Sequence, residues 1–322
     1  MAHANEADTR RISQGLTTIV GDSLEQHQAL TAGTDTAKWV QESEYSFAYP
    51  DRAAFEADSF AWQLRKEAGF EPSFIEGRDV QDAEPILGDD TQFLAVMKNH
   101  GFILNPGSYV GDLVKLFEEM GGTFVQAEAR DFDLSGGQIT AIDTSAGRIH
   151  CSKAVVSSGV WSKPLMQKLG LNVPLETERG YHIVFKGANL KPNNPMMLTV
   201  GKFVATPMDY GVRCAGVVEF GGLSEKPSKA PLKLLRRKAK EMFPDLTSVS
   251  DEEWLGYRPA PSDSLPLIGE LGKTGVYSAF GHHHIGLTGG PKTGRLVADM
   301  IAGNHSNNDI RPFEPMRFAA GK

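Results

Sequence analysis

Two hydrophobic spacings alternate along this chain, and the pattern changes near residue 105. Sparse apolar positions in residues 1–40 predict polar helices, and residues 45–49 alternate aromatic and small side chains as a strand does. The sequence also predicts helices over 51–69 and 78–85 and a strand over 93–97.

Beyond residue 105, short apolar runs alternate with helical spacing, which is typical of α/β structure. Asn105-Pro-Gly predicts a helix start, and Gly303 predicts the end of the last helix. The elements expected here are a helix from Asn105 to Gly121, a strand over 123–125, a hairpin of 138–142 and 148–150, a strand and helix over 154–170, and a final strand and helix over 276–303.

Residues 172–220 follow a third pattern, in which apolar and polar residues alternate between turn residues. This pattern predicts an antiparallel sheet inserted between two α/β stretches. The basic residues of the following helix, 232–243, predict a solvated face. The fold class expected is α/β, or α+β overall, as in a two-domain enzyme with a nucleotide cofactor.

Composition narrows the function. The chain has 322 residues and a net charge of −7, so it has no basic footprint for nucleic acid. No apolar run reaches the roughly 18 residues of a membrane span, and residues 1–14 do not read as a signal peptide. Cys151 and Cys214 are expected to be reduced thiols. We therefore expect a cytoplasmic protein, with peripheral membrane association left open.

The glycine-rich turn after the last predicted strand is the first candidate site. A strand, a turn rich in glycine and a helix N-terminus aim backbone N–H groups and a positive dipole end at whatever lies above them. Gly281, Gly286, Gly289 and Gly290 allow close backbone approach. An ordinary connection between strand and helix explains the same residues, and both interpretations stay open.

Five motifs in order resemble one enzyme family. They are Ala154-Val-Val-Ser-Ser-Gly-Val-Trp-Ser162, Arg179-Gly-Tyr-His182, the run from Asp209 to Phe220, Gly256-Tyr-Arg-Pro259 with Ser262-Asp263 and Pro266-Leu-Ile-Gly269, and Gly281-His282 through Thr293-Gly294. Over residues 45–305 the chain resembles FAD-dependent amino acid oxidoreductases of the D-amino-acid dehydrogenase and glycine oxidase type. The resemblance implies FAD as cofactor, an FAD-binding Rossmann-like domain, and oxidative deamination by hydride transfer to the flavin.

One feature of that family is not found. Proteins that resemble this family begin with a strand–Gly-x-Gly-x-x-Gly–helix unit. Residues 1–60 of this chain contain no such pattern. An incomplete FAD domain is therefore expected, and a catalytically silent remnant or a mis-started reading frame is the alternative to an active enzyme. The domains expected are 1–104 with part of the substrate domain, 105–170 and 259–305 as a partial FAD domain, 171–258 as an antiparallel substrate domain, and a tail of 306–322.

The resemblance also implies site residues. Arg258 would bind the substrate carboxylate, for which its planar guanidinium is suited. Tyr181 and His284 complete the candidate catalytic set, although a satisfied sheet hydroxyl explains Tyr181 equally well and the role of His284 stays open. The candidate cofactor-binding residues are Val125, Ser157, Gly159, Trp161, Gly281, His282, Gly286, Leu287 and Thr288.

The three consecutive histidines suggest a metal, but adjacent residues of a turn cannot all face one ion. No metal is therefore expected, and a metal-binding module that uses His282 and His284 is the weaker alternative. The partners expected are an amino acid and an electron acceptor, which is a quinone, a dye-like acceptor or oxygen.

Overall fold

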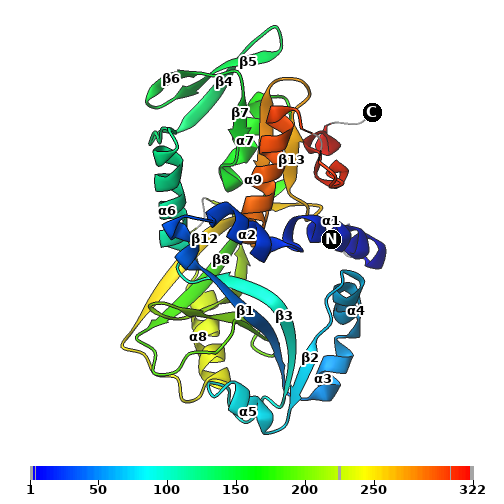
Figure 1. Ribbon diagram of the computed structural model, residues 1–322, viewed down its shortest axis with the longest axis vertical. Coiled ribbons are helices and arrows are strands. Elements are labelled where there is room, and N and C mark those ends of the chain that lie inside the picture. The colour runs from blue at the N-terminus through cyan, green and yellow to red at the C-terminus, as the bar shows by residue number, and fades with distance from the viewer. Residues whose placement is uncertain (1–2, 4, 224–225, 305, 320–322) are drawn as a thin grey trace. The chain divides into compact units, whose positions relative to one another are not determined.

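The computed structural model describes residues 3, 5–223, 226–304 and 306–319 (Figure 1). The chain divides into two compact units, each built from separate stretches of sequence. Unit 1 consists of Met1–Gln26, Val114–Glu178 and Tyr257–Lys322, and unit 2 consists of His27–Leu113 and Arg179–Gly256. The domain boundaries expected from the sequence stay a prediction.

Unit 1 contains two three-stranded sheets, ordered β13-β14-β7 and β4-β5-β6. Strand β14 pairs in parallel with β7 and antiparallel with β13. The elements of unit 1 are α1 (Glu6–Val20), β4 (Ala129–Ser135), β5 (Gln138–Thr144), β6 (Gly147–His150), β7 (Ala154–Val156), a 3-10 helix (Gly159–Trp161), α7 (Ser162–Lys168), β13 (Leu267–Glu270), β14 (Val276–Phe280), α9 (Gly286–Ala302) and two further 3-10 turns (Arg311–Phe313 and Pro315–Phe318).

Strand β14 is buried on both faces because its side chains alternate between two cores. Val276 and Phe280 pack into a core with α7 and β7, whereas Tyr277 packs into a core with Leu296 of α9 and Ile19 of α1. Helices thus cover both faces of this small sheet, which is the arrangement that parallel strands require (Figure 1).

Unit 2 is organised by a mixed sheet of eight strands in the order β12-β8-β11-β10-β9-β1-β3-β2. Strand β1 pairs antiparallel with β3 and in parallel with β9. The elements of unit 2 are a 3-10 helix (Asp35–Trp39), β1 (Val40–Tyr49), α3 (Arg52–Ala57), α4 (Ser59–Glu67), β2 (Ser73–Glu76), α5 (Asp79–Ala83), β3 (Phe93–Ile103), β9 (Met196–Leu198), β10 (Phe203–Met208), β11 (Gly211–Phe220) and α8 (Ala230–Met242). Four elements continue from one unit into the other: α2 (Ser23–Thr31), α6 (Pro106–Glu119), β8 (Leu175–Lys186) and β12 (Ser250–Pro261).

Helix α8 covers part of this sheet with its apolar face. Leu235 and Ala239 are buried in the main core of unit 2 together with Cys214 of β11. Lys233, Arg237 and Lys240 are exposed, so the solvated face predicted for this helix is confirmed. Both cysteines are free thiols: Cys214 is fully buried, and Cys151 is half-buried against a core of unit 1.

A buried carboxylate ties two segments of unit 2 together. Glu84, which follows α5 and is 2% exposed, accepts hydrogen bonds from the backbone N–H groups of Asn193 at 2.7 Å and Asn194 at 3.1 Å. Burial raises the pKa of Glu84 to about 7, and these two backbone hydrogen bonds oppose that shift. The segment that leads into β9 is held by this side chain.

The structure confirms the predicted α/β class and nearly all of the expected helices and strands. Asn105 caps α6, since its Oδ1 accepts the backbone N–H of Ser108, and Gly303 ends α9 with φ +76°. The strand expected over 123–125 is wrong, because this segment is irregular and no described strand pairs with it. Among the described helices, none combines the length and the hydropathy needed to cross a membrane.

Candidate active site

The site of unit 1 starts where β14 ends. Phe280 is followed by the turn 281–285, and α9 begins at Gly286. The turn is closed by hydrogen bonds from Ile285 N–H to the His282 carbonyl at 2.9 Å and from Gly289 N–H to the Ile285 carbonyl at 2.8 Å. The first turn of α9 therefore presents the positive end of the helix dipole beside this turn.

A cleft of about 540 Å³ lies along this turn and α9. Its volume falls within the range of about 300–1,000 Å³ that is typical of small-molecule sites. Five predicted cofactor residues line it, namely Ser157, Gly159, Gly281, His282 and Gly286. The remaining wall comes from the ends of β7 and β14 and from one side of α9.

One face of α9 is made of glycine where it borders the cleft. Gly286, Gly290 and Gly294 are four residues apart and therefore lie on the same side of the helix. A Cβ atom at Gly290 or Gly294 would meet nothing within 4 Å, and the same holds for Gly159 on another wall of the cleft, whose φ is +59°. The cleft thus has a flat backbone surface that can contact a broad planar group closely.

His282 is fixed to α9. Its Nε2 lies 2.9 Å from the Thr293 hydroxyl oxygen, and the residue is 8% exposed. Burial, followed by the neighbouring His283, lowers the pKa of His282 to about 4. The imidazole is therefore neutral at neutral pH, and it contributes a hydrogen-bonding group and no charge to the cleft.

His283 adopts a left-handed backbone conformation with φ +48°. Its backbone N–H donates to the Pro259 carbonyl at 3.0 Å, and Nδ1 of its imidazole lies 3.7 Å from Oε1 of Glu178. Its Nε2 is buried and has no hydrogen-bond partner among the described residues. Burial lowers the pKa of His283, although the carboxylate of Glu178 opposes the shift. The turn thus brings β8, β12 and the start of α9 together.

Arg258 lies on β12, one residue before Pro259, and is half-buried. Within the described part of the chain, its guanidinium has neither a hydrogen bond nor an ion pair within 4.0 Å. Burial lowers the pKa of Arg258, and the negative charge of Glu178 opposes this effect. A permanently charged group that is partly removed from water without a partner requires an anion nearby.

His284 lies beside this guanidinium. The pKa of His284 is lowered mainly by loss of hydration among neighbouring atoms and, to a smaller extent, by the positive charge of Arg258. Part of the side chain nevertheless remains exposed to solvent. Together with His282 and His283 it lines a second, smaller cavity of about 150 Å³. The described residues hold no group of three or more side chains that is suited to bind a metal ion.

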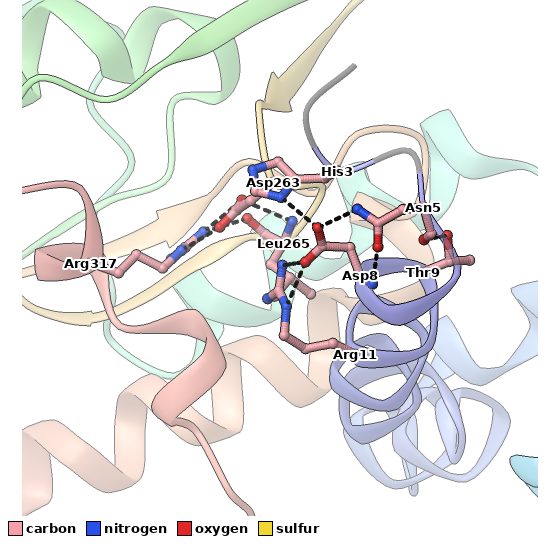
Figure 2. Close-up of polar contacts among 8 residues, drawn as sticks. All are labelled: His3, Asn5, Asp8, Thr9, Arg11, Asp263, Leu265 and Arg317. Atoms are coloured by element: carbon pink, nitrogen blue, oxygen red, sulfur yellow. Dashed lines mark hydrogen bonds and ion pairs between the residues drawn. The ribbon is translucent and has the colours of Figure 1, made fainter.

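A buried ion pair fixes the segment after Arg258. Arg317 donates from Nε to Oδ2 of Asp263 at 2.8 Å and from Nη2 to Oδ1 at 3.2 Å, and also to the Leu265 carbonyl at 2.7 Å. Figure 2 shows this fork, together with Asp8 at the start of α1, which is surrounded by Asn5, Arg11 and His3. Asp263 is therefore already neutralised by Arg317, whereas Arg258 has no described partner.

The third candidate catalytic residue, Tyr181, belongs to unit 2. It is 2% exposed, and its hydroxyl donates to Oε2 of Glu219 at 2.6 Å. Arg179 binds the same oxygen at 3.2 Å and the carbonyls of Gly221 and Gly222. The hydrogen bond from Tyr181, together with Arg179, lowers the pKa of Glu219 to about 2. These contacts favour the structural interpretation of Tyr181.

The other predicted cofactor residues do not line the cleft. Val125 is 47% exposed in its irregular segment, and Trp161 is 55% exposed with its ring edge against Tyr257. Leu287 and Thr288 lie in the first turn of α9 and are exposed. Sequence reasoning missed Glu178, which directly precedes the Arg179-Gly-Tyr-His182 motif. The adjacent motif was a signal for it, but a lone carboxylate on a strand usually faces solvent.

Comparison with known proteins identifies the family. A family model described as FAD dependent oxidoreductase matches residues 4–300. The chain belongs to this family. It is 33% identical to a D-amino-acid oxidase of Bradyrhizobium diazoefficiens over 318 residues, which are 97% of this chain and 75% of that protein. It is 27% identical to a glycine oxidase of Pseudomonas putida over 269 residues, which are 81% of this chain and 71% of that protein.

Two solved structures share the fold. The glycine oxidase of Geobacillus kaustophilus superposes with a TM-score of 0.81 at 19% identity, over 96% of this chain and 84% of that one. The L-proline dehydrogenase of P. horikoshii gives a TM-score of 0.79 at 17% identity, over 96% and 84%. The predicted family, fold class, oxidoreductase activity and FAD dependence are thereby confirmed. The individual site residues stay predictions.

Proposed function

We propose that this FAD dependent oxidoreductase oxidises a D-amino acid, or a glycine-type amine, at its Cα. The products are a 2-imino acid, which water hydrolyses to a 2-oxo acid and ammonia, and reduced flavin. The relatives named for D-amino-acid and glycine oxidation support this substrate class. An electron acceptor must then reoxidise the flavin, because each turnover leaves two electrons on it.

The observation that carries the proposal is the unpartnered guanidinium of Arg258. A half-buried arginine without a described hydrogen bond or ion pair is suited to bind a carboxylate through two parallel N–H···O bonds. Every α-amino acid supplies such a carboxylate next to its Cα. Arg258 would therefore orient the carbon that is oxidised, as well as contribute affinity.

The cleft residues fit FAD. The glycine face of Gly286, Gly290 and Gly294, with Gly159 on another wall, leaves room for a broad planar group to contact the backbone. The N-terminus of α9 stabilises negative charge placed beside it. His282, held neutral and hydrogen-bonded to Thr293, would border the cofactor without adding charge. When bound, FAD accepts the hydride from the substrate.

The test uses purified protein incubated with FAD and then desalted. Flavin absorbance should remain with the protein, and anaerobic mixing with a panel of D-amino acids, glycine and N-methylglycine should bleach it with release of 2-oxo acid and ammonia. The matching L-amino acids are the control for stereochemistry. A protein that stays colourless, and reduces no dye with any amino acid of the panel, would falsify the proposal and favour a catalytically silent family member.

A further inference from the structure

Glu178 and Arg258 carry opposite charges and both belong to unit 1, on two strands that continue into unit 2. Glu178 lies near the start of β8 and Arg258 near the end of β12, and β8 and β12 are adjacent in the sheet. A hydrogen bond of 3.0 Å from Ser262 N–H to the Pro174 carbonyl ties the segments that flank them. The charge of Glu178 acts on both Arg258 and His284, so these groups share one electrostatic environment.

The two charges do not neutralise each other by direct contact. No ion pair within 4.0 Å joins Glu178 to Arg258, and the one described ion-pair contact of Glu178 is His283, at 3.7 Å. The side chains of Glu178 and His283 are each 18% exposed, and burial keeps His283 weakly basic. Since isolated charges lose favourable hydration when they are partly buried, each of the two requires a partner.

Another carboxylate of this region shows the contrast. Asp263 also acts on His283, yet its two oxygens accept the fork of Arg317 and the backbone N–H of Leu265. Asp263 therefore has its hydrogen-bonding capacity used within the protein. The carboxylate of Glu178 accepts no hydrogen bond from an arginine or a backbone N–H among the described residues, and its nearest charged or titratable contact is Nδ1 of His283 at 3.7 Å.

A pair of opposite charges held apart is complementary to a small zwitterion. We propose that Glu178 binds the ammonium group of the substrate while Arg258 binds its carboxylate, so that this part of the site selects the zwitterionic form of an α-amino acid. The inference rests on the proposed function and deepens it, because it names the group that recognises the amine. A purely structural alternative is that Glu178 only positions Arg258 or His283.

Two ligands separate these alternatives, because they share a carboxylate and differ at the amine. D-Alanine carries an ammonium group, and D-lactate carries a neutral hydroxyl in its place. Binding is measured by anaerobic titration calorimetry with the FAD-loaded protein reduced by dithionite, so that no turnover occurs. The variants are Glu178→Gln and, as matched control, Glu176→Gln, which alters an exposed carboxylate two residues earlier on the same strand.

The expected result is selective. Glu178→Gln should weaken D-alanine about ten- to a hundredfold, the loss typical of a hydrogen bond to a charged group. D-Lactate should bind unchanged or more tightly, because a negative charge near its carboxylate is removed. Glu176→Gln should change neither affinity. If Glu178→Gln does not fold, Glu178→Asp retains the charge at shorter reach and should weaken D-alanine alone, by a smaller factor.

Equal weakening of both ligands would assign Glu178 a structural role, and unchanged D-alanine binding would remove it from the site. Either result overturns the inference and leaves the proposed function standing if Arg258→Lys weakens both ligands. Failure of the wild-type protein to bind either ligand would instead overturn the proposed role of Arg258, and the role of Glu178 with it.

Discussion

At the scale of single residues, the site differs from its surroundings in how completely charges are paired. Arg317 and Asp263 form an ion pair with each other. Arg179 is 1% exposed, and it donates hydrogen bonds to the Glu219 carboxylate and to two backbone carbonyls. Arg258 has none of these contacts among the described residues. An arginine that stabilises the fold has its donors occupied, so the free fork of Arg258 is better explained by a ligand than by stability.

Replacing Arg258 by lysine should test this distinction. Lysine keeps the positive charge but loses the planar fork, and one of two hydrogen bonds to the carboxylate with it. The loss should cost about 1.5–3 kcal/mol, or about ten- to a hundredfold in kcat/KM. Part of it should appear in the rate of flavin reduction, measured by anaerobic stopped flow, since the carboxylate also aligns Cα. Normal reduction kinetics, or a collapsed thermal melt with loss of flavin, would indicate a structural role for Arg258.

At the scale of secondary-structure elements, α9 serves two purposes. Leu296 anchors it in the core with Ile19 of α1, while Gly286, Gly290 and Gly294 form the flat wall of the cleft, which Val297 also lines. Glycine is a poor residue for a helix interior, and it lowers helix stability by about 0.5–1 kcal/mol relative to alanine. The helix therefore gives up intrinsic stability where the cleft needs space.

Gly290→Leu should separate these two effects. A larger side chain would project into open space at this position, so folding is not obstructed, and the better helix former should hold or raise the melting temperature. Flavin binding should be lost or strongly weakened, because the side chain occupies the cleft. Gly111→Leu is the matched control, since it changes an exposed glycine of α6 with equally open surroundings. Normal FAD content in Gly290→Leu would show that the cofactor does not use this face.

Helices and strands with a clear hydrophobic periodicity were predictable from the sequence, whereas individual contacts between side chains were not. Strand β14 and α9 show their spacing in the sequence because each buries a defined face. Residues 123–125 have the composition of a strand but no described partner strand, and pairing is not encoded locally. Glu178 and Tyr181 both lie on β8, and their contacts with His283 and Glu219 depend on segments far away in the chain. The glycine-rich turn was therefore predictable from the sequence, whereas the charged side chains around Arg258 were not.

At the scale of the whole molecule, stability comes from two units with separate cores. The large core of unit 2 includes residues from β3, β10, β11 and α8, and those of unit 1 surround β14. Each unit consists of stretches distant in sequence, so its folding requires long-range contacts. A titratable group buried in one unit therefore affects the stability of that unit, and Glu84 is such a group in unit 2.

Glu84 should make unit 2 less stable as the pH rises. Its pKa is raised from 4.5 to about 7, so the folded state binds the proton more tightly than the unfolded state. The resulting stabilisation is fully present below about pH 4.5 and is lost as the pH rises to about 7, a change on the order of 3 kcal/mol. Glu84→Gln does not titrate, and its single carbonyl oxygen keeps an acceptor for only one of the backbone N–H groups of Asn193 and Asn194. Urea unfolding at pH 5 and pH 8 should show a smaller pH effect in the variant; equal pH effects would exclude Glu84 as the cause.

The two cysteines differ enough in burial to act as a chemical label for opening of unit 2. Burial raises the pKa of both thiols, but Cys214 is completely enclosed beside Leu235 and Ala239, whereas Cys151 still reaches the surface. Since a maleimide requires access and a thiolate, the native chain should gain one adduct at Cys151 first. A second adduct should appear only when the core around Cys214 opens. The ratio of singly to doubly modified chains in a mass spectrum would then report how often unit 2 opens, even in crude extracts where enzyme activity cannot be assigned.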